Sequence, residues 1–390
     1  MIIRLANEKD REGVYKTIGY CFNNNQSSIN HNIQYGDYNK YEQFIVALDD
    51  NENVESVTSV VPFQVYFEGK KVNFGGIAGV SSLPENRGSG NIAGIISYAL
   101  KYMKEKNMIL SGLGPFAFQF YRKFGYEWCY TWQLVTIPID DLKNFPAATT
   151  YKQLFEEDAF IVEEFRNEVN QKVNGPILRD ERIIHDKWAS YTSSNSHVYA
   201  AYNDHHEMVS YMVFSQSGRE IKVSEMYFKD EISRQYLLNF LYRHRSMVDK
   251  VELTLMTDDE IRNILPSPRI NYWHWPNKMG RVVMVKEALE LLNIEDCFED
   301  SYNLKVLDLH ADWNNKTFNI SCQNGHLIVK ETNEPEDFEI SIQRLSQITL
   351  GHLSAKEAVK YNFIKILNQN KTKLLYKSFS KRTTMLWQEF

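Results

Sequence analysis

Short apolar runs separated by polar turn residues dominate the first third of the chain, which is the pattern of β-strands. From Ile92 to Met103 the apolar residues instead recur every three or four positions with lysines between them, which predicts an amphipathic helix. Asn7–Tyr20 is expected to form an earlier, capped helix. The remaining elements predicted are strands at Ile2–Leu5, Phe44–Leu48, Glu55–Val61, Gln64–Phe67, Lys70–Leu83, Met108–Leu113 and Trp132–Ile139, and a short helix at Pro115–Arg122. Their order predicts a mixed α/β sheet.

The same alternation returns twice further along the chain. A second set of strands is expected at His197–Tyr202, Met208–Phe214, Ile221–Phe228 and Val251–Leu255, with a helix at Glu231–His244. From Gly280 a helix at Lys286–Leu292 precedes strands near Leu304–Leu309, Lys316–Cys322 and Leu327–Lys330, with a hairpin turn at Asn324-Gly325. We therefore expect three domains, at residues 1–146, 147–279 and 280–390.

Composition narrows the class of protein. The 390 residues are 43% hydrophobic and 24% charged, which is ordinary for a globular protein. A formal net charge of -6 argues against a nucleic-acid partner, because binding phosphates requires clustered Lys and Arg. No apolar run approaches the roughly 18 residues that span a bilayer, so no membrane association is expected and the protein is predicted to be cytoplasmic.

Neither the cysteines nor a histidine-containing turn predicts a metal or redox site. The four cysteines are far apart and form no CxxC pair, so they are predicted to be buried and reduced, with no disulfide framework. Asp204-His205-His206-Glu207 lies in a turn between two predicted strands, where adjacent side chains rarely converge on one ion. No metal is therefore expected.

The segment from Gly79 to Glu105 carries the clearest chemistry. A strand ends near Leu83, Arg87-Gly88-Ser89-Gly90 follows, and the amphipathic helix begins directly afterwards. A loop of this kind can direct backbone N–H groups and the positive end of the helix dipole at one anion. Two glycines alone are weak evidence, but the preceding strand, the arginine and the following helix together predict a pyrophosphate site.

The motif resembles that of the GCN5-related N-acetyltransferases, whose Arg/Gln-x-x-Gly-x-Gly/Ala pattern falls on Arg87, Gly90 and Ile92. Ile92 departs from the small residue of the general pattern, and one branch of the superfamily tolerates this. The chain as a whole resembles that branch, the enhanced intracellular survival (Eis) acetyltransferases. The stretches that carry this resemblance are Leu113–Pro115, Phe120–Tyr126, Met279–Val285 and Leu345–Ala355.

The resemblance implies two tandem acetyltransferase-like domains followed by a sterol-carrier-protein-like domain, with acetyl-CoA as cosubstrate. It implies that backbone groups of Val80 and Ser82 pair with the pantetheine arm. Gly88 stands where family members often have a second arginine, so the contact to the 3'-phosphate is expected to be weaker or to come from Asn86 or Lys123. The predicted cofactor site comprises Val80, Ser81, Ser82, Arg87, Gly88, Ser89, Gly90, Asn91 and Ile92.

The resemblance also assigns an acid and a base. Tyr121 matches the residue whose hydroxyl protonates the departing thiolate, although its aromatic neighbours also favour a simple core position. Tyr126 competes for this role but is expected to pack. In the family the C-terminal carboxylate takes a proton from the substrate amine, which here is that of Phe390; the alternative is that Phe390 is only a hydrophobic plug. Glu389 matches the family's substrate-facing acid. The apolar chain end predicts a docked tail.

The substrate is expected to be a primary amine of a small polyamine or aminoglycoside-like molecule, acetylated by direct attack, since no cysteine lies near the motif in sequence. Asn24 and Asp37 are further substrate-binding candidates.

The second domain has Lys229–Arg234, without glycine, at the position of the loop and is predicted to be silent. In the third domain, the segment that would line a cavity for a hydrophobic ligand is interrupted by four polar residues, His310, Asp312, Asn314 and Asn315. These residues could equally lie on the outer face or in a turn. Two alternatives stay open, a lipid carrier and a non-catalytic acetyl-CoA-binding regulator. Family resemblance also implies a hexamer.

Overall fold

A computed structural model describes residues 2–389, which form two compact units. The first unit contains residues 2–130, 277–382 and 388–389, so the N-terminal and C-terminal thirds of the chain fold together. The second unit contains residues 131–276 and 383–387. The chain thus leaves the first unit, builds the second, and returns.

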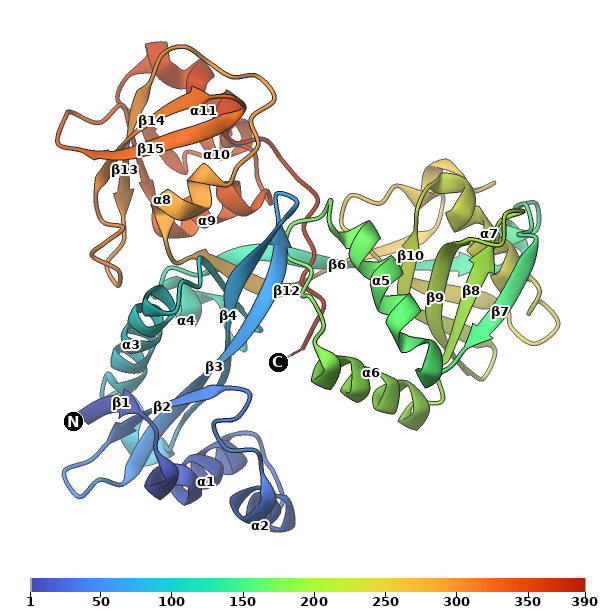
Figure 1. Cartoon of the computed structure of the whole chain (residues 1–390), viewed down its shortest axis with the longest axis horizontal. Helices are drawn as coiled ribbons and strands as arrows, with labels where there is room; N and C mark the ends of the chain where they lie inside the picture. Colours follow the sequence, from blue (N-terminus) through green and yellow to red (C-terminus); the bar gives the residue numbers. More distant parts are fainter. Residues whose placement is uncertain (1, 390) are drawn as a thin grey trace. The chain divides into compact units, whose positions relative to one another are not determined.

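A mixed sheet forms the centre of the N-terminal part of the first unit (Figure 1), with strand order β1-β2-β3-β4-β5-β12. The β4–β5 pair is parallel, whereas the β1–β2, β2–β3, β3–β4 and β5–β12 pairs are antiparallel. The strands are β1 (Ile2–Leu5), β2 (Gln43–Leu48), β3 (Val54–Phe67), β4 (Lys70–Ser82), β5 (Leu110–Leu113) and β12 (Asn271–Val282). The helices are α1 (Arg11–Cys21), α2 (Gln26–Tyr35), α3 (Asn91–Glu105) and α4 (Phe118–Arg122).

Two helices cover the two faces of this sheet, as Figure 1 shows. One face packs on α3 through a core that includes Ile96 and Leu100, both fully buried. The other packs on α1 around Val14. Because β5 ends at Leu113, opposite Ile77, β4 continues to Ser82 beyond the last parallel pair. The sheet therefore opens on the side where β4 leads into α3.

The C-terminal part of the first unit is a five-stranded sheet of order β15-β14-β13-β16-β17 with four helices. Its strands are β13 (Tyr302–Leu307), β14 (Thr317–Gln323), β15 (His326–Thr332), β16 (Phe338–Ser341) and β17 (Ile364–Ile366). Its helices are α8 (Val285–Glu290), α9 (Ile342–Leu350), α10 (Ala355–Lys360) and α11 (Thr372–Ser378). The predicted hairpin turn at Asn324-Gly325 is confirmed, with φ of +52° and +78°.

The second unit contains a sheet of order β6-β11-β10-β9-β8-β7, in which β10 and β11 are the parallel pair. Its strands are β6 (Glu127–Pro138), β7 (Thr150–Leu154), β8 (His197–Tyr202), β9 (Met208–Ser217), β10 (Glu220–Phe228) and β11 (Lys250–Leu255). Its helices are α5 (Ala159–Asn170), α6 (Glu181–Ser193) and α7 (Glu231–Tyr242). The chain end packs here as well: Met385 donates a backbone hydrogen bond to Asn174 at 2.9 Å, and Leu386 is fully buried. The prediction of a docked tail is confirmed for these residues.

Six helices among the described residues, α2, α5, α6, α9, α10 and α11, are absent from the sequence prediction, which treated α2 as a loop. Helix α2 buries only Ile29, so its sequence has almost no apolar periodicity to detect. Helices α5 and α6 bury larger faces than α2, but the sequence analysis predicts no element in either segment.

The prediction of reduced cysteines is wrong for two of the four. Cys297 and Cys322 form a disulfide, with their Cα atoms 5.5 Å apart across 25 positions of sequence. Packing of the C-terminal module brings them together, which spacing alone could not show. Cys21 and Cys129 are free thiols.

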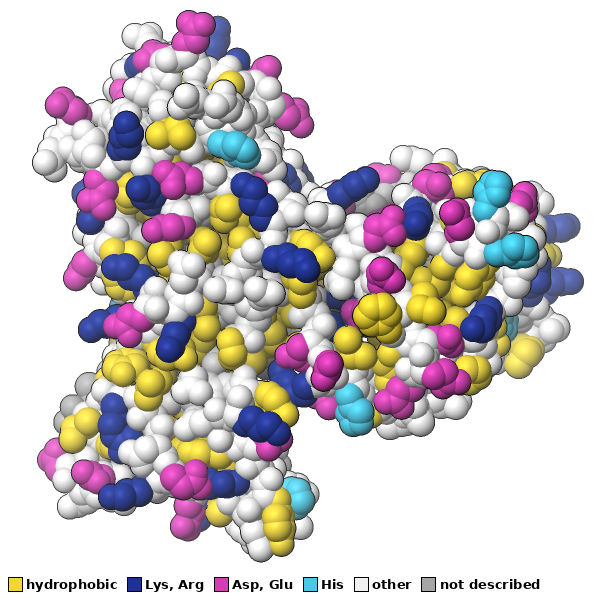
Figure 2. All heavy atoms as spheres, in the orientation of Figure 1, with side chains coloured by type: hydrophobic (Ala, Val, Ile, Leu, Met, Phe, Trp, Pro, Cys, Tyr) yellow, Lys and Arg dark blue, Asp and Glu magenta, His cyan; other side chains and the backbone are white. Residues whose placement is uncertain are grey.

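Surface charge is mixed on the face shown in Figure 2, where basic and acidic side chains alternate and no broad stripe of one sign is visible. None of the helices in residues 2–389 is both long and apolar enough to cross a bilayer.

Candidate active site

The loop between β4 and α3 leaves its backbone open to a ligand. Gly88 and Gly90 have φ of +84° and +90°, a region that glycine occupies without strain, and a Cβ at either would meet no atom within 4 Å. Gly90 precedes α3 as its cap without a side-chain hydrogen bond. The first N–H groups of α3 have no partner within the helix, so they can bind an anion at the positive end of its dipole.

A cavity of about 910 Å³ lies beside this loop. All nine predicted cofactor residues line it, from Val80 through Ile92. Ser81 Oγ is buried there without a hydrogen-bond partner among the described residues, which leaves it available to a ligand. Asn91 Nδ2 instead donates to Glu55 Oε2 at 2.8 Å, so its side chain is already occupied. Its backbone N–H remains for a ligand. The other lining residues are Cys21, Phe22, Asn86, Ala93, Phe116, Phe120, Lys123, Phe124 and His310.

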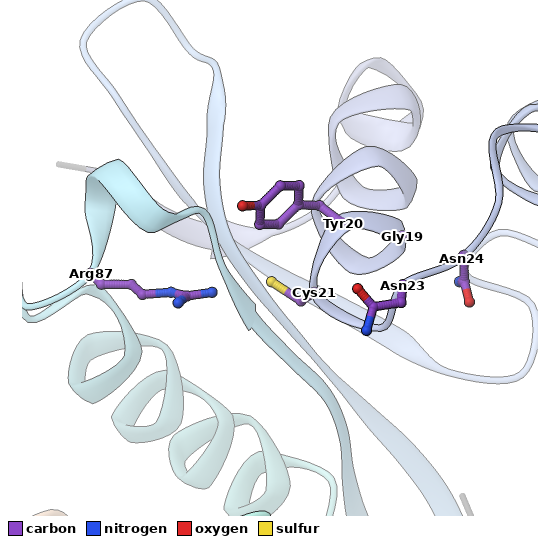
Figure 3. Close-up of a pocket in the computed structure, with 6 residues that line it drawn as sticks. All are labelled: Gly19, Tyr20, Cys21, Asn23, Asn24 and Arg87. Atoms are coloured by element: carbon purple, nitrogen blue, oxygen red, sulfur yellow. The ribbon is translucent and has the colours of Figure 1, made fainter.

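A second cavity of about 550 Å³ shares Cys21 and Arg87 with the first. In Figure 3 the guanidinium of Arg87 extends from the glycine loop toward Cys21 and the turn after α1. Arg87 Nε donates to the carbonyl oxygen of Ser82 at 3.3 Å. Asn24, a predicted substrate residue, lines this smaller cavity. The two cavities therefore meet where the cofactor loop faces the end of α1.

Cys21 corrects one step of the sequence argument, which counted no cysteine near the motif. Its Sγ lies 3.4 Å from the carbonyl oxygen of Ser82, a residue 61 positions away in sequence. The packing of α1 against β4 brings them together, so distance along the chain was a poor guide. Among the described residues, the free thiol has no hydrogen bond to a histidine or a carboxylate that would activate it.

Tyr121 is 3% exposed and lies next to the large cavity, without being part of its described lining. Its ring packs edge-on against Phe116 and Phe120, which do line the cavity, at centroid distances of 5.3 and 5.1 Å. Burial, with a smaller contribution from Tyr126, raises the pKa of Tyr121 above its ordinary value. The hydroxyl therefore holds its proton at neutral pH. Tyr126 is fully buried and hydrogen-bonds Ser111 Oγ at 2.7 Å, so it packs as expected.

The chain end is held by a buried lysine in the first unit. Lys278 Nζ donates to Glu389 Oε2 at 2.5 Å, and the lysine side chain is 2% exposed whereas that of Glu389 is 71% exposed. The carboxylate of Glu389 is thus shared with a cation of the protein itself. Phe390, the predicted base, lies outside the described residues.

Asp37, the other predicted substrate residue, follows α2 and pairs with Lys40 at 3.4 Å. It is not among the described lining residues of either cavity. Its role in substrate binding stays a prediction.

The counterpart of the loop in the second unit is closed by its own side chains. Asp230 caps α7, accepting from the backbone N–H of Ser233 at 2.9 Å and from its hydroxyl at 2.7 Å. These hydrogen bonds lower the pKa of Asp230. Arg234 is engaged by Glu231 and by Asp259, whose Oδ1 lies 2.6 Å from Nη1. A carboxylate of the chain therefore occupies the place where an anion would bind.

His310 is a lining residue that sequence reasoning missed. It lies in the turn between β13 and β14, and its Nδ1 is 3.0 Å from Ser97 Oγ on α3. Of the alternatives for this polar segment, a position in a turn is correct. The two residues are 213 positions apart, so no local signal could have paired them.

Comparison with known families and structures defines the class. Residues 2–129 and 175–285 match two acetyltransferase (GNAT) domain families, and residues 285–387 match the sterol carrier protein domain. The chain therefore contains two acetyltransferase (GNAT) domains followed by a sterol carrier protein domain, which confirms the predicted fold. Its domains are those of an acetyl-CoA-dependent acyltransferase.

Among particular proteins, the chain is similar to a GCN5-related N-acetyltransferase of Anabaena variabilis, at 20% identity, full coverage of both chains and a TM-score of 0.87. A probable N-acyltransferase of Enterococcus faecalis V583 gives 21% identity, coverage of 100% of this chain and 99% of that one, and a TM-score of 0.87. Eis1 from Mycobacterium abscessus gives 14% identity, full coverage of both chains and a TM-score of 0.83. At these identities the likeness shows the fold alone. No curated protein matches the chain.

Proposed function

We propose that the first domain transfers the acetyl group of acetyl-CoA to a primary amine of a small polyamine or aminoglycoside-like molecule by direct attack. The observation that carries this proposal is the cavity of about 910 Å³ on which the glycine loop, the free end of β4 and Ser81 converge. Open space at Gly88 and Gly90, together with the unpartnered buried Ser81 Oγ, fits a ligand with phosphate and amide groups.

Acetyl-CoA would supply an activated acetyl thioester. Arg87 and the first N–H groups of α3 would hold the pyrophosphate by charge-assisted hydrogen bonds. Backbone groups of Val80 and Ser82, beyond the end of β5, would pair with the pantetheine arm. Most of the rate would come from holding the amine and the thioester in line.

The second cavity supports an acceptor site next to the cofactor site, since Arg87 and Cys21 belong to both. Asn24 lines it, and no carboxylate is among its described lining residues. A polycationic amine would therefore rely on Glu389 and the terminal carboxylate, and on nearby aromatic side chains such as Tyr20.

Tyr121 would give its proton to the departing sulfur, since burial keeps the hydroxyl protonated. The carboxylate of Phe390 would accept the proton of the amine. The buried Lys278 supports this, because it holds the neighbouring Glu389. An ordinary α-carboxyl pKa of about 3.5 is low for this task, so the proton would pass through water or the pKa must be raised by burial.

The test is CoA thiol release from acetyl-CoA with a panel of polyamines and aminoglycosides. We expect Tyr121→Phe to lower kcat about 100-fold with little change in KM for acetyl-CoA, because a general acid acts only in the chemical step. Tyr126→Phe is the matched control, since it removes a hydroxyl that bonds only Ser111 among the described residues.

Other outcomes would redirect the assignment. Absence of thiol release with every amine, together with tight lipid binding, would favour the carrier function that the sterol carrier protein match suggests. Binding of CoA without any effect of Tyr121→Phe or of deleting Phe390 would favour a regulator. Loss of all turnover in Cys21→Ala would argue for a covalent step in place of direct attack.

A cytoplasmic location, expected because no apolar run is long enough to span a bilayer, and a hexameric assembly, implied by the family resemblance, complete the proposal. Light scattering on the purified full chain would test the hexamer.

A further inference from the structure

One lining residue of the cofactor cavity, His310, comes from the sterol carrier protein domain. His310, in the turn between β13 and β14, lines the cavity of the first domain. Its Nδ1 lies 3.0 Å from Ser97 Oγ on α3, and its ring meets that of Phe124 edge-on at 5.3 Å. The imidazole is thus placed between α3 and the end of α4.

The turn that carries His310 is held firmly. Arg281 and Asp308 form a fully buried pair with two hydrogen bonds of 2.9 and 2.7 Å. Arg281 also donates to the carbonyl oxygen of Phe124, and the backbone N–H of His310 donates to Asp308 Oδ1 at 3.1 Å. Trp313 Nε1 donates to the carbonyl oxygen of Val283 at 2.8 Å. The ring is therefore fixed before any ligand arrives.

The position of His310 along the cavity matches one part of CoA. Ser97 lies six residues after Asn91 on α3, about 9 Å along the helix axis. The 3'-phosphate of CoA is separated from its pyrophosphate by one ribose, a comparable span. Lys123 lines the cavity next to Phe124 and is exposed, and its side-chain ammonium has no ion-pair or hydrogen-bond partner within residues 2–389.

The glycine loop does not supply a cation for the 3'-phosphate. CoA carries three phosphates, whereas the loop offers one guanidinium, from Arg87, and Gly88 follows it without a side chain. An ammonium and an imidazole with a free N–H are suitable phosphate ligands. If Ser97 donates its hydroxyl hydrogen to Nδ1, the proton of the neutral ring stays on Nε2.

The geometry points to a subsite for the 3'-phosphate of CoA formed by His310 of the sterol carrier protein domain together with Lys123 of the first domain. This inference rests on the proposed acetyl-CoA site. It gives the third domain a part in cofactor selection, and it makes the cofactor site a product of two domains.

The test is titration calorimetry of the full chain with CoA and with 3'-dephospho-CoA. We expect the unchanged protein to bind CoA at least roughly ten-fold more tightly than dephospho-CoA, as charge-assisted hydrogen bonds would give. His310→Ala and Lys123→Ala should each reduce that preference several-fold and leave the affinity for dephospho-CoA unchanged. His310→Gln, which keeps an N–H donor, should retain part of the preference.

Two controls separate a ligand from a structural tie. Leu309→Ala changes the neighbouring residue, which is 89% exposed, and Lys101→Ala removes an exposed charge of α3; neither should alter the preference. Equal weakening of both ligands by His310→Ala would overturn the subsite, because it would show that the histidine only joins two domains. An unchanged preference in all variants would overturn it as well. If neither ligand binds the unchanged protein, the proposed acetyl-CoA function fails first.

Discussion

In the first domain β4 passes through residues 83–90 into α3 and then to the parallel strand β5, whereas in the second domain β10 passes through residues 229–230 into α7 and then to the parallel strand β11. Gly90 caps α3 without a side-chain hydrogen bond, and Asp230 caps α7 with one. The N-terminus of α3 is therefore open to the anion of a ligand, whereas the N-terminus of α7 is already capped by the carboxylate of Asp230.

The charged side chains differ in the same sense. Arg87 of the first domain is exposed at the edge of a cavity. In the second domain Arg179 is almost fully buried and bonds both Glu163 and Glu225, at 2.8 and 2.7 Å. The comparison teaches that one fold can direct its polar groups either to a ligand or to its own core. It also predicts one cofactor per chain.

The largest effect expected from this difference is acid sensitivity of the second domain. Burial raises the pKa of Glu225, but Arg179, Lys187 and Arg166 outweigh burial and lower the pKa to about 2. A carboxyl with a lowered pKa stabilises the fold above its ordinary pKa of about 4.5, and this stabilisation is lost as the pH falls toward 2. The free energy of unfolding should fall by about 3 kcal/mol over that range. Urea unfolding followed by tryptophan fluorescence, to which the buried Trp188 of this domain contributes, measures the loss.

Glu225→Gln should remove this pH dependence while lowering stability at neutral pH, because Arg179 loses a buried partner. Arg87→Ala, a change at an exposed cation, should leave the unfolding curve as it is. Equal acid sensitivity with and without Glu225 would break the comparison.

An intermediate effect is expected at the glycine loop. Gly90→Val places a branched side chain at φ +90°, which costs about 2 kcal/mol of strain and blocks the approach to the first turn of α3. Acetyl-CoA affinity should fall about 30-fold, measured by calorimetry. Gly218→Val is the matched control, because Gly218 also has positive φ and open space but lies in the β9–β10 turn of the second domain. A similar loss of affinity in that control would contradict the assignment.

The smallest effect is expected at the closed helix end. Asp230→Ala removes the cap of α7 and should lower the stability of the second domain by about 1 kcal/mol, with no change in KM for acetyl-CoA. Urea unfolding followed by tryptophan fluorescence and steady-state kinetics measure the two quantities. Binding of a second CoA per chain, before or after the substitution, would show that this domain is not silent.

Sequence patterns sufficed where the structure is local. The strand before the loop, the two glycines with positive φ and the amphipathic α3 are encoded within some 25 consecutive residues, from Val80 to Glu105. Helix α2 was not predicted because it buries a single side chain, Ile29, and so shows almost no apolar periodicity. The disulfide of Cys297 with Cys322 and the contact of Cys21 with Ser82 depend on tertiary packing, for which no periodicity exists.

The lining of the cavity shows the same division. Every predicted cofactor residue lies between Val80 and Ile92, within or directly beside the loop. His310 belongs to the opposite end of the chain, and the contact that places it is Ser97, in the middle of α3. A residue held by such a contact can be found only once the fold is known.

Gly125 shows what this means for taking the protein apart. Its φ is +85°, and a Cβ there would lie 1.4 Å from Nη1 of Arg281. Only a residue without a side chain therefore leaves room for this guanidinium. That guanidinium hydrogen-bonds the carbonyl of Phe124, 157 residues away along the chain. A fragment that ends after the first domain would keep Gly125 but lack Arg281, and the buried carbonyl of Phe124 would lose this hydrogen bond. Loss of activity on truncation would then report a damaged first domain and would say nothing about what the removed part does.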